Sequence, residues 1–117
     1  MTKEIKRYQT NARMSRVVVH GDVAHLAGVI AADRSGDIKA QTAEVLGRID
    51  ELLASVETDK SKLLSTQIWL ANFEADFDGM NEIWDAWLPE NCAPARATCQ
   101  TTLPAQVLIE VIVTAAI

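Results

Sequence analysis

The chain has 117 residues, of which 49% are apolar and 23% charged, and its net charge is −5. This length suits a single domain, residues 1–117, with a core large enough to need neither a metal nor a disulfide. An acidic chain without a basic stripe is poorly suited to binding nucleic acid, and no apolar stretch is long enough to cross a membrane. Because the sequence opens without an apolar signal segment, we expect a cytoplasmic protein with reduced cysteines.

The first third of the chain predicts three strands. They are expected at residues 5–9, 17–19 and 23–28. The dipeptide Gly21-Asp22 separates two β-branched runs, which indicates a hairpin. Gly28 closes the third strand and leaves room for close approach of a backbone or a ligand. His20 and His25 flank the turn, and we interpret them as exposed strand residues rather than as an acid–base pair.

A helix is expected at residues 38–57, after a loop at 31–37. Its apolar residues recur at helical spacing: Ala43, Leu46, Ile49, Leu53 and Val56. Polar residues fall mostly on the other side: Gln41, Glu44, Arg48, Asp50 and Glu51. One face of this helix should therefore pack on a sheet.

The second half of the chain predicts a strand at 63–70, a helix at 76–88 and two final strands. In strand 63–70, one alternate set suits a helix-covered core: Leu64, Thr66, Ile68 and Leu70. The other set resembles a subunit interface: Leu63, Ser65, Gln67 and Trp69. Asn72 and Asp76 are candidate caps of the second helix, and Pro89 ends it.

This order of elements predicts an α+β fold with two helices on one face of a mixed β-sheet. The last strand is apolar on both sides, so we expect the other face of the sheet to be too apolar to face water. We therefore expect an oligomer that packs sheet to sheet, with an intertwined sandwich within one chain as the alternative.

Arg96 and Glu110 are the two charges in the otherwise uncharged stretch from residue 91 to residue 113. A charge on a strand that otherwise favours burial needs a partner or a ligand. Arg96 is thus either half of a structural ion pair, with Glu110 as the candidate partner, or a ligand-binding residue.

The residues around Arg96 carry a family resemblance. The segment 93–98 with the Leu103-Pro104 turn and the run 107–111 resembles the signature of the Rid (YjgF/YER057c/UK114) family, and the pattern 80–87 is similar to its short YoaB-like branch. The resemblance implies a chorismate-mutase-like fold and a homotrimer with clefts between subunits. It also implies hydrolysis of 2-imino or enamino acids to 2-oxo acids and ammonia, without a metal or an organic cofactor.

The resemblance implies roles for five residues. Arg96 would anchor the substrate carboxylate, because a guanidinium forks onto a carboxylate with two parallel hydrogen bonds. The other substrate-binding candidates are Asn81, Thr98, Glu110 and Gly28. Asn81 is equally well explained as a helix cap or a surface amide. By strand alternation, Thr98 shares the side of Arg96.

Three departures from the family pattern are visible. Ile112 replaces the second C-terminal glutamate, Ala27 replaces a serine before Gly28, and the tyrosine of the cleft has no clear counterpart. Cys99 is interpreted as a small buried hydrophobe rather than a nucleophile. These departures leave open a second function, a small-carboxylate-binding or regulatory module without turnover. Ribonuclease activity, a third reading, conflicts with the acidic charge.

Overall fold

Six strands form one mixed sheet in the computed structural model, which describes residues 3–117. The strands are β1 (Ile5–Thr10), β2 (Ser15–His20), β3 (Val23–Leu26), β4 (Leu63–Leu70), β5 (Ala95–Gln100) and β6 (Ile109–Ala116). Their order across the sheet is β1-β2-β3-β6-β4-β5. Strands β4 and β5 run parallel, and the other neighbouring strands are antiparallel.

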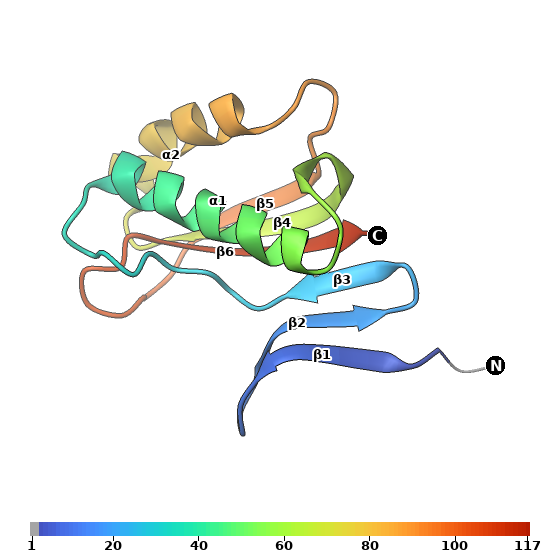
Figure 1. The fold of residues 1–117 in the computed structure, drawn as a ribbon. Helices are drawn as coiled ribbons and strands as arrows, with labels where there is room; N and C mark the ends of the chain where they lie inside the picture. Colours follow the sequence, from blue (N-terminus) through green and yellow to red (C-terminus); the bar gives the residue numbers. More distant parts are fainter. Residues whose placement is uncertain (1–2) are drawn as a thin grey trace.

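Two helices, α1 (Ile38–Ser55) and α2 (Phe73–Trp87), lie side by side on one face of the sheet (Figure 1). This arrangement confirms the predicted α+β fold class. The helices approach closely at Gly79, where a Cβ atom would lie 2.8 Å from Cγ2 of Ile38. The core between helices and sheet includes the fully buried Leu46, Ile68 and Ile109.

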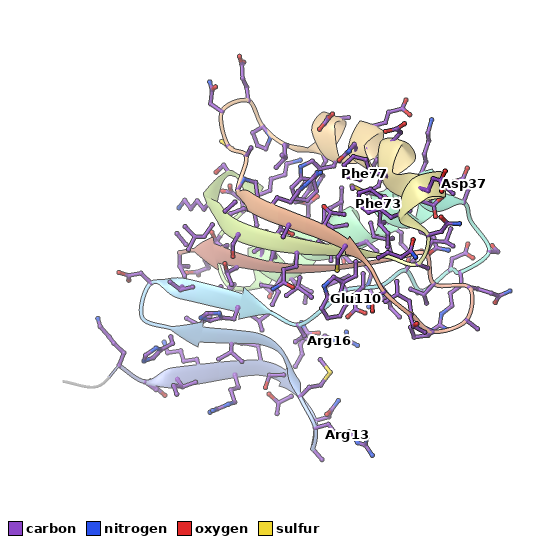
Figure 2. All side chains as sticks on the ribbon, turned by 180° about the vertical axis from the view of Figure 1, so that it is seen from behind. Arg13, Arg16, Asp37, Phe73, Phe77 and Glu110 are labelled. Atoms are coloured by element: carbon purple, nitrogen blue, oxygen red, sulfur yellow. The ribbon has the colours of Figure 1, made fainter. Side chains whose placement is uncertain are left out.

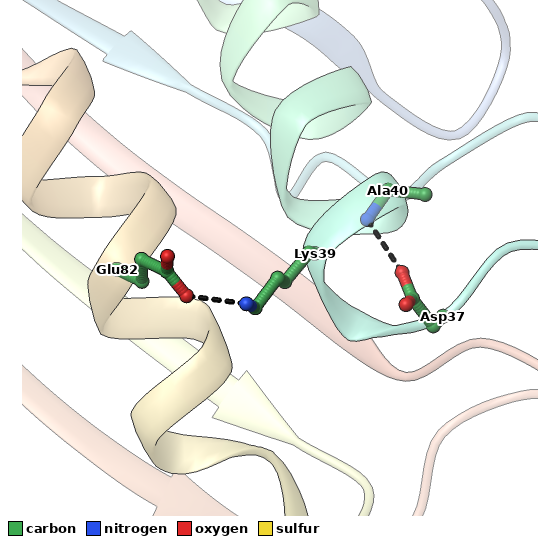
Figure 3. Close-up of polar contacts among 4 residues, drawn as sticks. All are labelled: Asp37, Lys39, Ala40 and Glu82. Atoms are coloured by element: carbon green, nitrogen blue, oxygen red, sulfur yellow. Dashed lines mark hydrogen bonds and ion pairs between the residues drawn. The ribbon is translucent and has the colours of Figure 1, made fainter.

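Side-chain caps set the beginnings of both helices. The Asp37 carboxylate accepts a hydrogen bond from the Ala40 N–H at 2.9 Å (Figure 3). Asn72 accepts one from the Ala75 N–H at 3.1 Å, so α2 begins three residues before the predicted residue 76. At the other end, α1 stops at Ser55 rather than at residue 57. A short 3-10 helix, η1 (Lys60–Lys62), then leads into β4.

The polar side predicted for α1 is wrong at Gln41, which is 1% exposed. Its side chain is buried because it bonds to the backbone of two loops. The amide nitrogen donates to the carbonyls of Gly36 and Gln106, and the amide oxygen accepts from the Leu108 N–H. Conversely, the predicted core residue Ala43 is exposed.

The predicted core face of β4 is wrong at its first residues, because Leu64 is exposed and Leu63 is buried. The pairing of β4 with β6 shifts register between Leu63 and Ser65. A bulge of this kind places two consecutive residues against one partner and reverses the alternation on one side of it. From Thr66 onward the predicted alternation holds.

The chain is also bulged after β3, next to Gly28. His25 pairs with Thr114, and Val29 bridges Val111. From His25 to Val29 the chain advances four residues, whereas from Thr114 to Val111 it advances three. The segment after β3 therefore contains one extra residue. Bulges re-aim side chains and occur often beside functional sites. Here the bulge brings Gly28 against Glu110 of β6.

The face of the sheet that the helices leave open is mixed in character. It carries the exposed polar residues His25, Ser65 and Gln67 beside the half-buried Trp69 and Ile112. The open face is thus less apolar than the last strand alone suggested. The packing of sheet against sheet between copies stays a prediction.

Candidate functional site

Arg96 lies on β5 beneath α2. In the parallel pairing of β4 and β5 it stands opposite Thr66, whose side chain is on the helix-covered face. Its Nη1 donates a hydrogen bond to Oδ1 of Asn81 at 2.8 Å. The guanidinium carbon lies 5.9 Å from the ring centre of Phe77 and 5.7 Å from that of Trp84. Helix α2 therefore orients the guanidinium with one amide and two aromatic rings.

The remaining donors of Arg96 have no acidic partner. Among residues 3–117, the one ion pair with nitrogen and oxygen within 4 Å joins Lys39 of α1 to Glu82 of α2 (Figure 3). Arg96 opens instead into a cavity of about 420 Å³ between α2 and the segment before β5. Besides Asn81 and Arg96, this cavity is lined by Trp84, Asp85, Leu88, Ala93 and Pro94. A guanidinium with free donors in a cavity is suited to bind a carboxylate.

The structure shows what Asn81 does and adds Asp85 to the site. Asn81 lies inside α2 and not at its end, so the helix-cap reading is wrong; its Oδ1 accepts from Arg96. Asp85 was missed by the sequence reasoning. It lies four residues after Asn81, and residues at that helical spacing share a face. The four-residue spacing from Asn81 could therefore have identified Asp85 from the sequence.

Thr98 shares the helix-covered face with Arg96, as predicted from alternation. It pairs with Ile68 of β4, which is fully buried on that face. The Thr98 Oγ1 atom is buried and has no hydrogen-bond partner among the described residues. Buried hydroxyl groups are usually paired, so Thr98 retains an unused donor and acceptor two residues from the anchor.

Glu110 and Gly28 lie apart from Arg96. Glu110 stands opposite Trp69 of β4, and Trp69 stands opposite Cys99 of β5, three residues from Arg96. Because side chains alternate along a strand, Glu110 and Arg96 occupy opposite faces of the sheet. Figure 2 shows Glu110 beside the end of β3 and Phe77 on α2. An ion pair between Arg96 and Glu110 within one chain is therefore excluded.

Gly28 makes room for Glu110. A Cβ atom on Gly28 would overlap the Glu110 carboxylate and would lie 2.9 Å from its Cδ. Both residues line a cavity of about 320 Å³ together with Arg16, Arg34 and Arg48. The five predicted site residues thus divide into two groups, Arg96 with Asn81 and Thr98, and Gly28 with Glu110.

The other residues that the sequence singled out have simpler positions. Cys99 is exposed on the open face, so its interpretation as a buried hydrophobe is wrong: β5 is an edge strand, and no helix covers that side. His20 and His25 are exposed, as predicted. Residues 3–117 hold no cluster of three or more potential metal ligands. Within the same residues, no helix has the length and apolar character of a membrane span.

Comparisons with known proteins bear on the resemblance. The family model described as Endoribonuclease L-PSP matches residues 4–117. A RutC family protein of Haemophilus ducreyi is 40% identical over 114 residues, 97% of each chain. The RutC family protein YoaB of Escherichia coli is 38% identical over 99 residues, 85% of each chain. A more distant plant protein, Reactive Intermediate Deaminase A, chloroplastic, of Arabidopsis thaliana, is 37% identical over 78 residues, which are 66% of this chain and 41% of the plant protein.

A solved structure agrees with these sequence relatives. NMB1025 of Neisseria meningitidis, described as a member of the YjgF protein family, superposes with a TM-score of 0.94. It is 31% identical, and the match covers 99% of this chain and 97% of that one. The sequence relatives and the solved structure therefore indicate the same family. The chain belongs to the Rid (YjgF/YER057c/UK114) family, and it is similar to the YoaB-like proteins within that family.

Proposed function

We propose that this protein hydrolyses 2-imino acids, and the enamino acids that tautomerise to them, to 2-oxo acids and ammonia. The observation that carries the proposal is the guanidinium of Arg96, which Asn81 and two aromatic rings orient and which has no acidic partner in residues 3–117. The name of the plant relative, a reactive intermediate deaminase, supports the same chemistry.

The reaction needs little from the protein. The substrate carboxylate would bind the free edge of Arg96 with two parallel hydrogen bonds, which fixes the adjacent C=N carbon. Water would add to that carbon, and the C–N bond would then break to release ammonia and leave the 2-oxo acid. Because the uncatalysed reaction is already feasible, orientation of the imine and of the water would supply most of the acceleration. The Asp85 carboxylate, which lines the cavity, is a candidate to hold that water.

We further propose that the active form is a homotrimer with the site between subunits. In one chain, Arg96 and Glu110 occupy opposite faces of the sheet, so one copy does not assemble all five predicted residues. A neighbouring copy would supply Gly28 and Glu110 to the cleft that contains Arg96. The mixed open face, with Trp69 and Ile112 half-buried, supports its use as the contact surface.

A coupled assay tests the activity. An amino-acid oxidase or a threonine dehydratase would generate 2-iminopropanoate or 2-iminobutanoate, and release of the 2-oxo acid would be followed with and without the protein. Arg96→Ala should lower the rate constant by about 100-fold, because it removes two charge-assisted hydrogen bonds. Arg13→Ala is a matched control, since Arg13 is exposed on the turn between β1 and β2 (Figure 2). An unchanged rate in Arg96→Ala would refute the assignment.

The second candidate function is a small-carboxylate-binding module without turnover. It is favoured by Ile112, which replaces a family glutamate and is half-buried on the same strand as Glu110. Calorimetry with 2-oxobutyrate separates the two functions. Affinity that depends on Arg96 without accelerated imine hydrolysis would support the module. The family model is described as an endoribonuclease. A net charge of −5 does not suit the binding of RNA, so we do not propose that activity for this chain.

A further inference from the structure

Trp87, the last residue of α2, is fixed by contacts on two sides of its ring. Its Nε1 donates a hydrogen bond to Oδ2 of Asp50 in α1 at 3.0 Å. The Nζ atom of Lys60, in η1, lies 5.1 Å from the ring centre. The indole N–H points along the ring plane and a cation binds over the ring face, so the two contacts restrain different directions of movement. Trp87 thereby ties the end of α2 to α1 and to the segment before β4.

A series of contacts leads from Trp87 to Arg96. The ring centres of Trp87 and Trp84 are 5.4 Å apart, and the ring planes are inclined by 45°. Trp84 is 4% exposed, and its ring centre lies 5.7 Å from the guanidinium carbon of Arg96. Both separations fall within the ranges of aromatic pairs and of cation–π contacts. Because closely packed side chains move little without their neighbours, the position of the Trp87 ring affects Trp84 and hence Arg96.

A second polar contact joins the same two helices but has no such path. Lys39 of α1 forms the ion pair with Glu82 of α2, and the two side chains are 50% and 63% exposed. Neither residue lines the cavity of the candidate site. Asp50 differs because its partner Trp87 packs on Trp84, which does line that cavity. The two pairs therefore separate the task of holding the helices together from the task of orienting the guanidinium.

We propose that Asp50 is a positioning residue that acts on Arg96 through Trp87 and Trp84. Asp50 does not line the cavity, so a ligand there does not touch it. Two parallel hydrogen bonds to a carboxylate require the guanidinium plane to match that of the ligand. The neighbouring tryptophan ring restricts the tilt of that plane, and a misplacement of about 1 Å caused by a distant substitution can cost on the order of 100-fold in rate. The proposal rests on the proposed function, because it takes Arg96 as the carboxylate anchor.

Calorimetry with 2-oxobutyrate tests the role of Asp50. Asp50→Ala removes the acceptor, and the dissociation constant should rise about fivefold, which is the effect of one weakened hydrogen bond to the ligand. Asp50→Asn keeps an acceptor oxygen and should bind as the wild type does. A purely structural role has a different signature. Partial unfolding lowers the number of binding sites per chain and leaves the dissociation constant of the folded fraction unchanged.

Two further variants identify the hydrogen bond as the cause. Trp87→Phe keeps a ring next to Trp84 and removes the N–H donor, so it should raise the dissociation constant as much as Asp50→Ala does. The double variant should bind no more weakly than either single variant, because both lose the same hydrogen bond. Lys39→Met is the matched control, since it breaks the other polar contact between α1 and α2 and should leave the dissociation constant unchanged.

A spectroscopic readout tests the position of Arg96 without any ligand. The ring current of the nearby tryptophan shifts the NMR signal of the Arg96 Nε–H group, which is identified by its loss in Arg96→Lys. The signal should move in Asp50→Ala and Trp87→Phe and stay in place in Lys39→Met. An unmoved signal in Asp50→Ala would overturn the proposal, and so would an unchanged dissociation constant where the wild type binds 2-oxobutyrate. A wild type that neither binds 2-oxobutyrate nor hydrolyses imines would refute the proposed function, and the Arg96 signal would still decide the role of Asp50.

Discussion

Gln41 joins two loops, the one before α1 and the one before β6. Its side chain is 1% exposed and makes three backbone contacts at 3.1 Å or less, to the Gly36 carbonyl, the Gln106 carbonyl and the Leu108 N–H. Gln41→Met keeps the length of the side chain and removes every hydrogen bond. The three backbone groups then lose their partner in a place where water does not readily replace it.

Each of these contacts contributes about 1 kcal/mol, so the free energy of unfolding should fall by about 3 kcal/mol. For a chain of this size, that loss lowers the melting temperature by about 10 °C. A further loop contact, from the Gln41 amide to the Arg34 carbonyl at 3.3 Å, is lost as well.

Urea unfolding followed by circular dichroism measures the free-energy change. Lys62→Met is the control, because Lys62 is exposed and its side chain makes no hydrogen bond among the described residues. Such a surface change should shift the free energy of unfolding by less than about 0.5 kcal/mol. If Gln41→Met is no less stable than Lys62→Met, the two loops do not depend on Gln41, and the reasoning fails.

Three further predictions concern the helices and Gly28. Asp37→Ala removes the cap of α1 and should lower the free energy of unfolding by about 1 kcal/mol in thermal denaturation. The Glu82 carboxylate, 2.5 Å from the Lys39 ammonium, raises the pKa of Lys39 above its ordinary 10.5 (Figure 3). The ion pair therefore stabilises the fold fully below pH 10.5, and this stabilisation is lost as the pH rises through the raised pKa. The difference in stability between the wild type and Lys39→Met should accordingly shrink above pH 10.5 and in high salt. Gly28→Ala should destabilise the protein because the new methyl group overlaps the Glu110 carboxylate, and adding Glu110→Ala should restore much of the loss, as a double-mutant cycle would show.

Sequence periodicity predicted which helices and strands form, but it did not predict correctly which side chains of each element are buried. The apolar stripe of α1 was visible, yet Gln41 was assigned to the polar side, because its partners are backbone groups more than sixty residues away. The predicted burial of Leu63 and Leu64 was reversed, because the bulge in β4 depends on its pairing with β6. Asn72 was recognised as a possible cap, and the choice between it and Asp76 required the tertiary contacts of Phe73 and Phe77.

The candidate site was predictable as a set of residues and not as an arrangement. The family signature singled out Arg96, whose role stays a prediction, and alternation correctly put Thr98 on the same side. The relation between Arg96 and Glu110 depends on two separate registers, β5 with β4 and β4 with β6, and neither is encoded in local sequence. The cavity that contains Gly28 and Glu110 was invisible for the same reason, since its residues come from distant segments.

The opposite placement of Arg96 and Glu110 leads to a test of the shared site. If each cleft takes Arg96 from one copy and Glu110 from its neighbour, then Arg96→Ala and Glu110→Ala chains are each inactive alone. When the two variants are unfolded together and refolded as a mixture, random assembly joins an intact Arg96 to an intact Glu110 in about a quarter of the clefts. The mixture should then recover about a quarter of the wild-type imine hydrolysis. An inactive mixture would mean that no cleft joins Arg96 of one copy to Glu110 of its neighbour, and a fully active Glu110→Ala variant would remove Glu110 from the site.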